Sequence, residues 1–256
     1  MFEQLSLLES SIDNDVRFHR NIQESGFDYQ EVDIGDITFK AGQLESVHRW
    51  YRLTPSYSPS LVRFLIKEFQ ITQGHFVADP FSGRGTTSIE CQKLGIKAVG
   101  IEINPLLQQV SNKSLKWDTG SLHLVKKYFT EASNLIKEYK NLSIQEVVNL
   151  FNTRIPIIHN VFRWWKDYAL KDLIIFREIM LKPEYSAVHE YLWIALNKAC
   201  LDCANIHRNH PTISFDDDHQ REIDVCYQVG NNLEMICNDL ENLSKEEICF
   251  SGLNSI

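Results

Sequence analysis

Apolar residues recur at helical spacing over most of this chain. Residues 59–70 place apolar side chains three and four positions apart, with Ser58 suited to cap the first turn. The same period recurs between about 105 and 206, including one continuous stretch over 160–180. The pattern therefore predicts a helix over 59–70 and a series of helices over 105–206. A last helix is expected over roughly 230–242.

A different pattern occupies residues 76–103. A short apolar run at 76–79 leads into a glycine-rich turn, and residues 96–103 form a β-branched run typical of a buried parallel strand. The residues between them predict a helix that ends at Gly95. The segment is thus a predicted strand–turn–helix–strand unit, and two parallel strands require such a crossover.

The two ends of the chain give weaker patterns. Residues 1–44 alternate short apolar and acidic pieces, which favours a short helix near 13–24 and a strand near 36–40. Residues 246–256 have a composition that could begin another strand. We divide the chain into an N-terminal extension (1–44), an α/β core (45–118) and a mainly helical region (119–256).

Composition excludes several classes of protein. With 43% hydrophobic and 23% charged residues in 256, the chain is neither disordered nor collagen-like nor a simple coiled coil. It has no run of 18 apolar residues and no secretory signal pattern at its start. These features, with six cysteines expected to be reduced, predict a cytoplasmic protein without a membrane anchor.

Charge is unevenly distributed. The formal net charge is −8, yet residues 45–130 hold eleven basic and six acidic side chains. The segment that contains the glycine-rich turn is therefore the expected place for an anionic partner.

The strongest chemical signal is the segment Val77-Ala78-Asp79-Pro80-Phe81-Ser82-Gly83-Arg84-Gly85-Thr86-Thr87. Glycines after a strand let backbone amides approach a ligand at a helix start, and Glu102 follows the next strand, where a ribose acceptor is expected. A phosphate loop would need lysine where Thr86 stands, and a dinucleotide motif would need a smaller residue than Ser88. The carboxylate of Asp79 suits a cationic, amine-bearing ligand, which favours S-adenosylmethionine.

This segment resembles the cofactor motif of amino-group DNA methyltransferases, which modify the exocyclic amine of adenine or cytosine. Residues 102–105 (Glu-Ile-Asn-Pro) resemble the second cofactor motif of that family, and residues 48–61 resemble the element that precedes the first. The resemblance implies an α/β, Rossmann-like methyltransferase core, incomplete here, with a mainly helical insert. It also implies that S-adenosylmethionine contacts Tyr57, Ser58, Asp79, Pro80, Phe81, Gly83, Gly85, Thr86, Thr87, Glu102 and Asn104. In the family, Asp79 and the amides of the turn would hold the methionine end and Glu102 the ribose.

The family's catalytic Asp/Asn/Ser-Pro-Pro-Tyr/Phe loop has no clear counterpart here, so the catalytic residues are unknown. The nearest string, Thr54-Pro55-Ser56-Tyr57, is better explained by the element before the cofactor motif. The missing loop would follow residue 256, which predicts a truncated enzyme or a second polypeptide that supplies it. The expected substrate is DNA, in restriction–modification or regulation, and residues 119–256 would recognise the target or dock the partner. An RNA or small-molecule methyltransferase, and a non-catalytic interaction protein on the same scaffold, stay open as alternatives.

Four other groups have simpler explanations. Cys200, Cys203, His207 and His210 invite a zinc interpretation, but they are too close together, so buried thiols and no metal are expected. The acidic run at 216–218 lacks the glycine and glutamate of a calcium loop. Basic and aromatic side chains could contact DNA. These are Arg163, Trp164, Trp165 and Lys166, with Lys113, Lys116, Lys126 and Lys127 as a phosphate path. The simpler explanation for the four lysines is a solvated helix face. At least one of the two adjacent tryptophans is expected in the core.

Overall fold

The structure is a computed structural model. It describes residues 42, 44–52, 56–207, 214–216 and 222–253, with side chains as far as residue 245. The helix and strand predicted within residues 1–40 lie outside the described residues.

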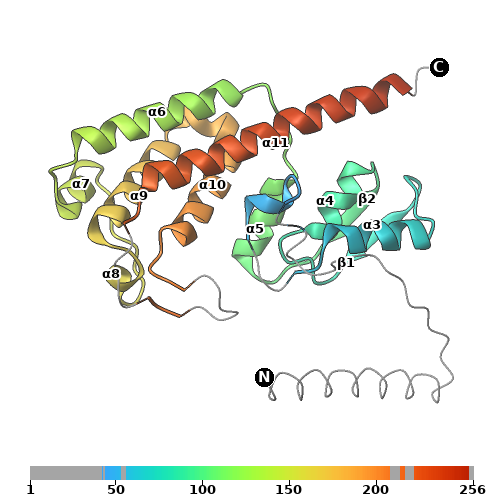
Figure 1. Ribbon diagram of the computed structural model, residues 1–256, viewed down its shortest axis with the longest axis horizontal. Coiled ribbons are helices and arrows are strands. Elements are labelled where there is room, and N and C mark those ends of the chain that lie inside the picture. Colours follow the sequence, from blue (N-terminus) through green and yellow to red (C-terminus); the bar gives the residue numbers. More distant parts are fainter. Residues whose placement is uncertain (1–41, 43, 53–55, 208–213, 217–221, 254–256) are drawn as a thin grey trace, which may run out of the picture. The chain divides into compact units, whose positions relative to one another are not determined.

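A two-stranded parallel sheet carries the glycine-rich turn (Figure 1). Strand β1 (Phe76–Asp79) pairs with β2 (Lys97–Gly100), in a register that sets Phe76 opposite Lys97 and Asp79 opposite Gly100. Helix α4 (Thr86–Lys93) connects them, and Gly95 follows it with a φ of +69°, a conformation that glycine adopts without strain. The predicted strand–turn–helix–strand unit is confirmed.

Helix α3 (Pro59–Glu68) begins where its sequence predicts. The Ser58 hydroxyl accepts a hydrogen bond from the backbone N–H of Leu61 at 3.3 Å, and Pro59 fills the first helical position. The buried side chains of α3 pack with Cys91 of α4 and with Ile96 before β2. This small core fixes α3 beside the sheet.

The sheet is more exposed than the sequence predicts. Phe76 of β1 is 65% exposed, and Val99 and Ile101 at the end of β2 are 42% and 61% exposed. The prediction of a buried strand over 96–103 is therefore wrong. Parallel sheets are normally covered on both faces, whereas a pair of strands has too few neighbours to bury its apolar side chains.

Helices account for the regular structure after β2 among the described residues, which confirms the predicted helical region. They begin with α5 (Pro105–Ser114) and continue with α6 (Leu122–Glu138), α7 (Ile144–Leu150), α8 (Val161–Trp164), α9 (Asp167–Met180), the 3-10 helix η2 (Pro183–Val188), α10 (His189–Asp202) and α11 (Val225–Leu253). A further 3-10 helix, η1 (His48–Trp50), precedes α3.

The main hydrophobic core lies among these helices. Helices α6, α9, α10 and α11 lie together in Figure 1 and contribute the fully buried side chains of Tyr128, Phe176, Leu192 and Ile236, respectively. Trp50 of η1 is also fully buried in this core, edge-on to Tyr191 of α10 with ring centroids 6.4 Å apart. The segment before the cofactor motif is thus anchored in the helical core. In the part of the chain that the structure describes, we find no helix long and apolar enough to cross a membrane.

Two helical predictions need correction. The stretch 160–180 is not one helix, because Trp165 is extended (φ −136°, ψ 142°) and separates α8 from α9. The last helix is also longer than predicted: α11 extends to Leu253, so residues 246–253 do not begin a strand.

Candidate cofactor site

The carboxyl ends of the two strands meet in a hydrogen-bonded corner. Beyond the strand pairing, the Ile101 N–H donates to the Asp79 carbonyl at 2.9 Å, and the Ser82 N–H donates to the Ile101 carbonyl at 3.0 Å. These bonds hold the turn that follows β1 against the segment that follows β2. Asp79 and Glu102 therefore lie at the same edge of the sheet, as the sequence predicts.

The Asp79 carboxylate lies in a small polar cluster. Its Oδ2 accepts a hydrogen bond from the Tyr57 hydroxyl at 2.7 Å, and its Oδ1 accepts one from the Phe81 N–H at 3.0 Å. The Tyr57 hydroxyl also lies 2.6 Å from Thr87 Oγ1. A carboxylate has about four acceptor positions, so these two bonds leave capacity for a ligand amine.

Tyr57 stays protonated at neutral pH. Burial raises the pKa of its hydroxyl to about 12, and the hydrogen bond to Asp79 acts in the same direction. The hydroxyl is therefore a permanent donor to Asp79. Tyr57 was predicted to belong to the cofactor site, and the structure places it beside Asp79 and Thr87.

The glycine turn depends on both of its glycines. Gly83 and Gly85 have φ values of +52° and +91°, in the left-handed region that side chains disfavour. A Cβ at Gly85 would also lie 2.3 Å from Ser111 Oγ of α5. Gly85 thus lets the turn approach the helix that follows the second motif.

Glu102 and Asn104 differ in whether a side-chain oxygen is left to accept a hydrogen bond from a ligand. Glu102 Oε1 accepts a hydrogen bond from the Asn104 N–H at 2.7 Å, and within the described residues its Oε2 has no such partner. Asn104 Oδ1 caps α5 by accepting from Leu106 N at 2.9 Å and Leu107 N at 3.4 Å. Glu102 can accept from a ligand hydroxyl, whereas Asn104 supports the helix behind it.

The remaining predicted residues also divide into those that support a helix and those that are open to a ligand. Ser58 caps α3, and Thr86 is buried at the start of α4. Pro80 and Phe81 are exposed, with Phe81 86% exposed. These two lie where an apolar or aromatic part of a ligand can cover them.

Arg84 is a residue that sequence reasoning missed. It stands between the two glycines and is buried, and its Nη1 donates to the backbone carbonyls of His48 and Tyr51, the latter at 3.1 Å. Burial lowers the pKa of its guanidinium to about 10, which leaves it charged at neutral pH. A basic residue at a variable position of the motif was the only available signal.

A charge network is centred on the buried carboxylate of Glu90 in α4. Glu90 Oε1 contacts His48 Nε2 at 2.7 Å and Lys93 Nζ at 2.9 Å, while its Oε2 contacts Arg63 Nη1 at 2.7 Å. Burial alone would raise the pKa of Glu90, but its bonds to His48 and Lys93 outweigh burial and lower the pKa to about 2. The network ties η1, α3 and α4 together.

Several of the other sequence candidates cannot be placed. Thr54, Pro55, His210, Asp217 and Asp218 lie outside the described residues. Ser56 accepts from Arg84 Nε at 3.4 Å, so the described half of residues 54–57 contacts the glycine turn and Asp79. Among the described residues, no three potential metal ligands lie close enough together to hold a metal ion.

The tryptophan pair divides as predicted. Trp165 packs against the main core and donates from Nε1 to the Cys200 carbonyl at 2.8 Å. Trp164 instead meets Phe215 edge-on, with ring centroids 4.8 Å apart, and the Arg163 guanidinium lies 4.1 Å from the Phe215 ring centroid. One tryptophan is structural and the other belongs to a mixed basic and aromatic surface.

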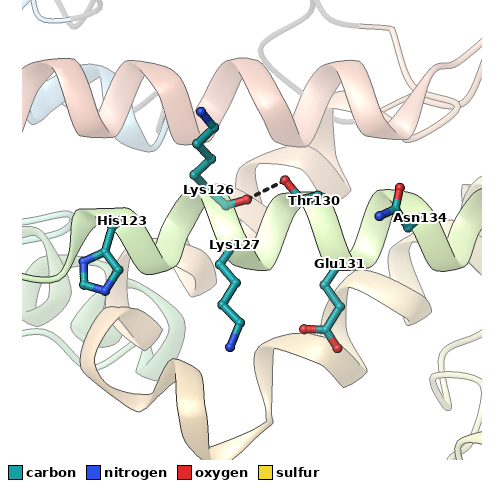
Figure 2. Close-up of a pocket in the computed structure, with 6 residues that line it drawn as sticks. All are labelled: His123, Lys126, Lys127, Thr130, Glu131 and Asn134. Carbon is teal, nitrogen blue, oxygen red and sulfur yellow. Dashed lines mark hydrogen bonds between the residues drawn. The ribbon is translucent and has the colours of Figure 1, made fainter.

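Two of the predicted phosphate-path lysines line an open groove on α6 of about 550 Å³ (Figure 2). Lys127 Nζ lies 3.3 Å from Glu184 Oε1, and Lys182 pairs with Glu131. Acidic partners thus offset part of the positive charge of the groove. None of the predicted cofactor residues lines the groove. A phosphate path along Lys126 and Lys127 stays a prediction.

Comparison with known proteins agrees with the motif. The model of the N6/N4 DNA methylase family matches residues 43–113. The type II methyltransferase M.BsoBI of Geobacillus stearothermophilus is 40% identical over 70 residues, 27% of this chain and 14% of that protein. M.MjaII of Methanocaldococcus jannaschii is 31% identical over 115 residues, 44% of this chain and 21% of that protein. M.AvaI of a Nostoc species is 34% identical over 74 residues, 29% of this chain and 15% of that protein.

These matches confirm the predicted resemblance to amino-group DNA methyltransferases over the segment that builds the site. The matched part of the chain spans between 14% and 21% of the length of these curated relatives. Comparison with solved structures gives no significant match.

Proposed function

We propose that residues 43–113, which match the DNA methylase family, bind S-adenosylmethionine and serve a methyltransferase that acts on the exocyclic amine of a DNA base. The observation that carries the proposal is the corner where β1 and β2 end. It combines a carboxylate with spare acceptor capacity, a turn whose two glycines have positive φ, and a second carboxylate on the same edge.

Each part of the corner suits one part of this cofactor. Asp79 would accept from the amino group of the methionine end, and the amides of the glycine turn would face its carboxylate. Glu102 Oε2 would accept from a ribose hydroxyl. The exposed ring of Phe81 would lie against the adenine. When bound, the cofactor supplies the methyl group, and these residues hold it in place.

The exposed sheet supports the proposal that the core is an incomplete Rossmann-like fold. Apolar side chains on both strands are open to solvent, including Phe76, Val99 and Ile101. Further strands would bury them, as parallel sheets require. We propose that the catalytic loop comes with those strands, from a further part of the protein or from a second polypeptide. Residues 119–256 would then dock that part or recognise the DNA target, and the expected location of the enzyme is the cytoplasm.

Isothermal titration with S-adenosylhomocysteine tests the cofactor assignment. The chain should bind the ligand, and Asp79→Asn should weaken binding by about tenfold or more, because a charge-assisted hydrogen bond to the amine is lost. Asp118→Asn is the matched control, since that exposed carboxylate accepts from Gly120 N in an unrelated turn. Absence of binding by the wild type, or equal losses in both variants, would contradict the proposal.

A methyl-transfer assay tests the incomplete-core assignment. This chain alone should transfer no methyl group from S-adenosylmethionine to DNA, and activity should appear when a polypeptide with the catalytic loop is added. Full activity of the chain alone would mean that the catalytic residues lie within it. Transfer to RNA or to a small molecule instead of DNA would favour the alternative substrates.

A further inference from the structure

Asp239 of α11 is a buried carboxylate that contacts the segment before the cofactor motif. It is 1% exposed and accepts hydrogen bonds from the Val47 N–H at 3.1 Å, from Arg49 Nε at 3.1 Å and from Trp50 Nε1 at 2.8 Å. Arg49 Nη2 donates to its second oxygen. We call these contacts the Asp239 clamp. A buried carboxylate is tolerated when donors surround it in this way.

The clamped segment has a strained backbone. Val47 has a φ of +68° with a ψ of −46°, a positive-φ conformation that is rare for a β-branched residue. Such a conformation persists only where surrounding contacts hold it. The hydrogen bond from Val47 N to Asp239 and the burial of Trp50 in the helical core supply those contacts.

The same segment holds the glycine turn. The carbonyls of His48 and Tyr51 accept hydrogen bonds from the Arg84 guanidinium. Arg84 lies between Gly83 and Gly85, whose positive φ values make the turn, and its side chain adds an anchor to the backbone bonds of Ser82 and Gly85. The positions of those two carbonyls therefore help to fix where the side chain of Arg84 lies, and through it they contribute to the path of the turn.

We propose that Asp239 is a positioning residue for the cofactor turn, acting through residues 47–51 and Arg84 without touching the ligand. The inference rests on the proposed cofactor-binding function. Asp239 follows Arg84 by 155 positions in the sequence, so cofactor affinity depends on a helix outside the matched family segment. Helix α11 thereby sets the geometry of the turn as well as contributing to the helical core.

Replacing the clamp residue by its neutral isostere tests the inference. Asp239→Asn should weaken S-adenosylhomocysteine binding by about tenfold at a temperature where circular dichroism shows the variant to be fully folded. Asp202→Asn is the matched control, because the bonds that Asp202 accepts from Lys198 at 3.1 Å and from Asn232 of α11 at 3.4 Å do not involve residues 47–51. A similar loss in both variants would make the effect one of general stability and overturn the inference.

A double variant tests whether Asp239 acts on cofactor affinity through Arg84 or independently of it. The double variant Asp239→Asn/Arg84→Lys should bind about as weakly as the weaker single variant, because both substitutions break the same path. Affinity losses that multiply would overturn the inference. If Asp239→Asn does not fold, Arg49→Lys and Trp50→Phe each weaken one contact of the clamp and should show the same coupling.

A readout without cofactor separates this inference from the proposed function. The amide resonances of Gly83 and Gly85 should shift in Asp239→Asn and stay in place in Asp202→Asn. Wild-type protein that fails to bind S-adenosylhomocysteine would contradict the proposed function, while these resonances would still report on the turn. Unshifted glycine resonances in Asp239→Asn would overturn the positioning role.

Discussion

The hydroxyl of Tyr57 joins the carboxylate of Asp79, at 2.7 Å, to the hydroxyl of Thr87, at 2.6 Å. One side chain thus connects the segment before α3, the end of β1 and the first turn of α4. Asp79 and Thr87 belong to the predicted cofactor motif, and Tyr57 belongs to the element that precedes it. Their contact fixes which way Asp79 faces.

Removing this hydroxyl should weaken cofactor binding while leaving the fold intact. Tyr57→Phe keeps the ring but leaves the Asp79 carboxylate held only by the Phe81 N–H among its described partners, so affinity for S-adenosylhomocysteine should fall by roughly tenfold. Tyr227→Phe is the control, because Tyr227 is 61% exposed. Titration calorimetry gives both affinities, and an unchanged value for Tyr57→Phe would show that Asp79 needs no such support.

Gly85 should tolerate no side chain. Gly85→Ala would impose a left-handed conformation on alanine, at about 1–2 kcal/mol, and would overpack the contact with Ser111, at about 1–3 kcal/mol. Urea unfolding should show a loss of about 2–4 kcal/mol, since part of the strain relaxes. Gly74→Ala is the control, because a Cβ there meets only Thr72 Oγ1 at 3.9 Å. Equal stabilities of the two variants would contradict the assigned packing.

Local parts of this site could be predicted from the sequence. The Ser58 cap, the helix end near Gly95 and the approach of Asp79 to Glu102 all follow from residue types and short spacings. The break at Trp165 was missed because the apolar period continues across it. The exposure of Val99 was missed because a β-branched run looks the same whether or not neighbouring strands cover it.

Long-range contacts account for the rest. Arg84 stands in the motif as an ordinary basic residue, and its burial depends on carbonyls 33 and 36 positions earlier. Asp239 meets Trp50 across 189 positions, and periodicity along a helix carries no information about such a pair. Only the folded structure reveals that the helical region holds residues 47–51, which precede the cofactor motif.

The role of Glu102 can be tested with a ligand analogue that lacks the ribose hydroxyls. Glu102→Gln removes the negative charge, so affinity for S-adenosylhomocysteine should fall about five- to tenfold. Affinity for an analogue that lacks the ribose hydroxyls should be the same in wild type and variant. Glu68→Gln, at an exposed position of α3, is the control. A Glu102→Gln loss that persists with the analogue would place the contact elsewhere on the cofactor.

Acidification should destabilise the protein through His48 and Glu90. Burial lowers the pKa of His48 below its ordinary 6.5, and its Nδ1 is buried without a hydrogen-bond partner in the described part of the chain. The unfolded chain therefore binds the proton first, and stability falls as the pH drops through about 6.5. Glu90 has a folded pKa of about 2 against an ordinary 4.5, so its contribution is present above pH 4.5 and is lost toward pH 2.

The histidine part of this dependence can be isolated. His48→Gln should flatten the fall in unfolding free energy between about pH 7 and pH 5, measured by urea unfolding at several pH values. His75→Gln, at an exposed position, should keep the wild-type slope. A His48→Gln variant with the wild-type slope would assign the acid sensitivity to other groups.

Substituting the two adjacent tryptophans one at a time should distinguish a role in stability from a role in DNA binding. Trp165→Ala removes core packing and the hydrogen bond to the Cys200 carbonyl, so the unfolding free energy should fall by about 3–5 kcal/mol. Trp164→Ala removes mainly the contact with Phe215 and should cost less stability. If this surface binds DNA, Trp164→Ala should lower affinity for a DNA duplex, measured by fluorescence anisotropy at fixed salt, because an aromatic contact to a base is lost. Unchanged DNA affinity in a folded Trp164→Ala variant would assign target recognition to another surface.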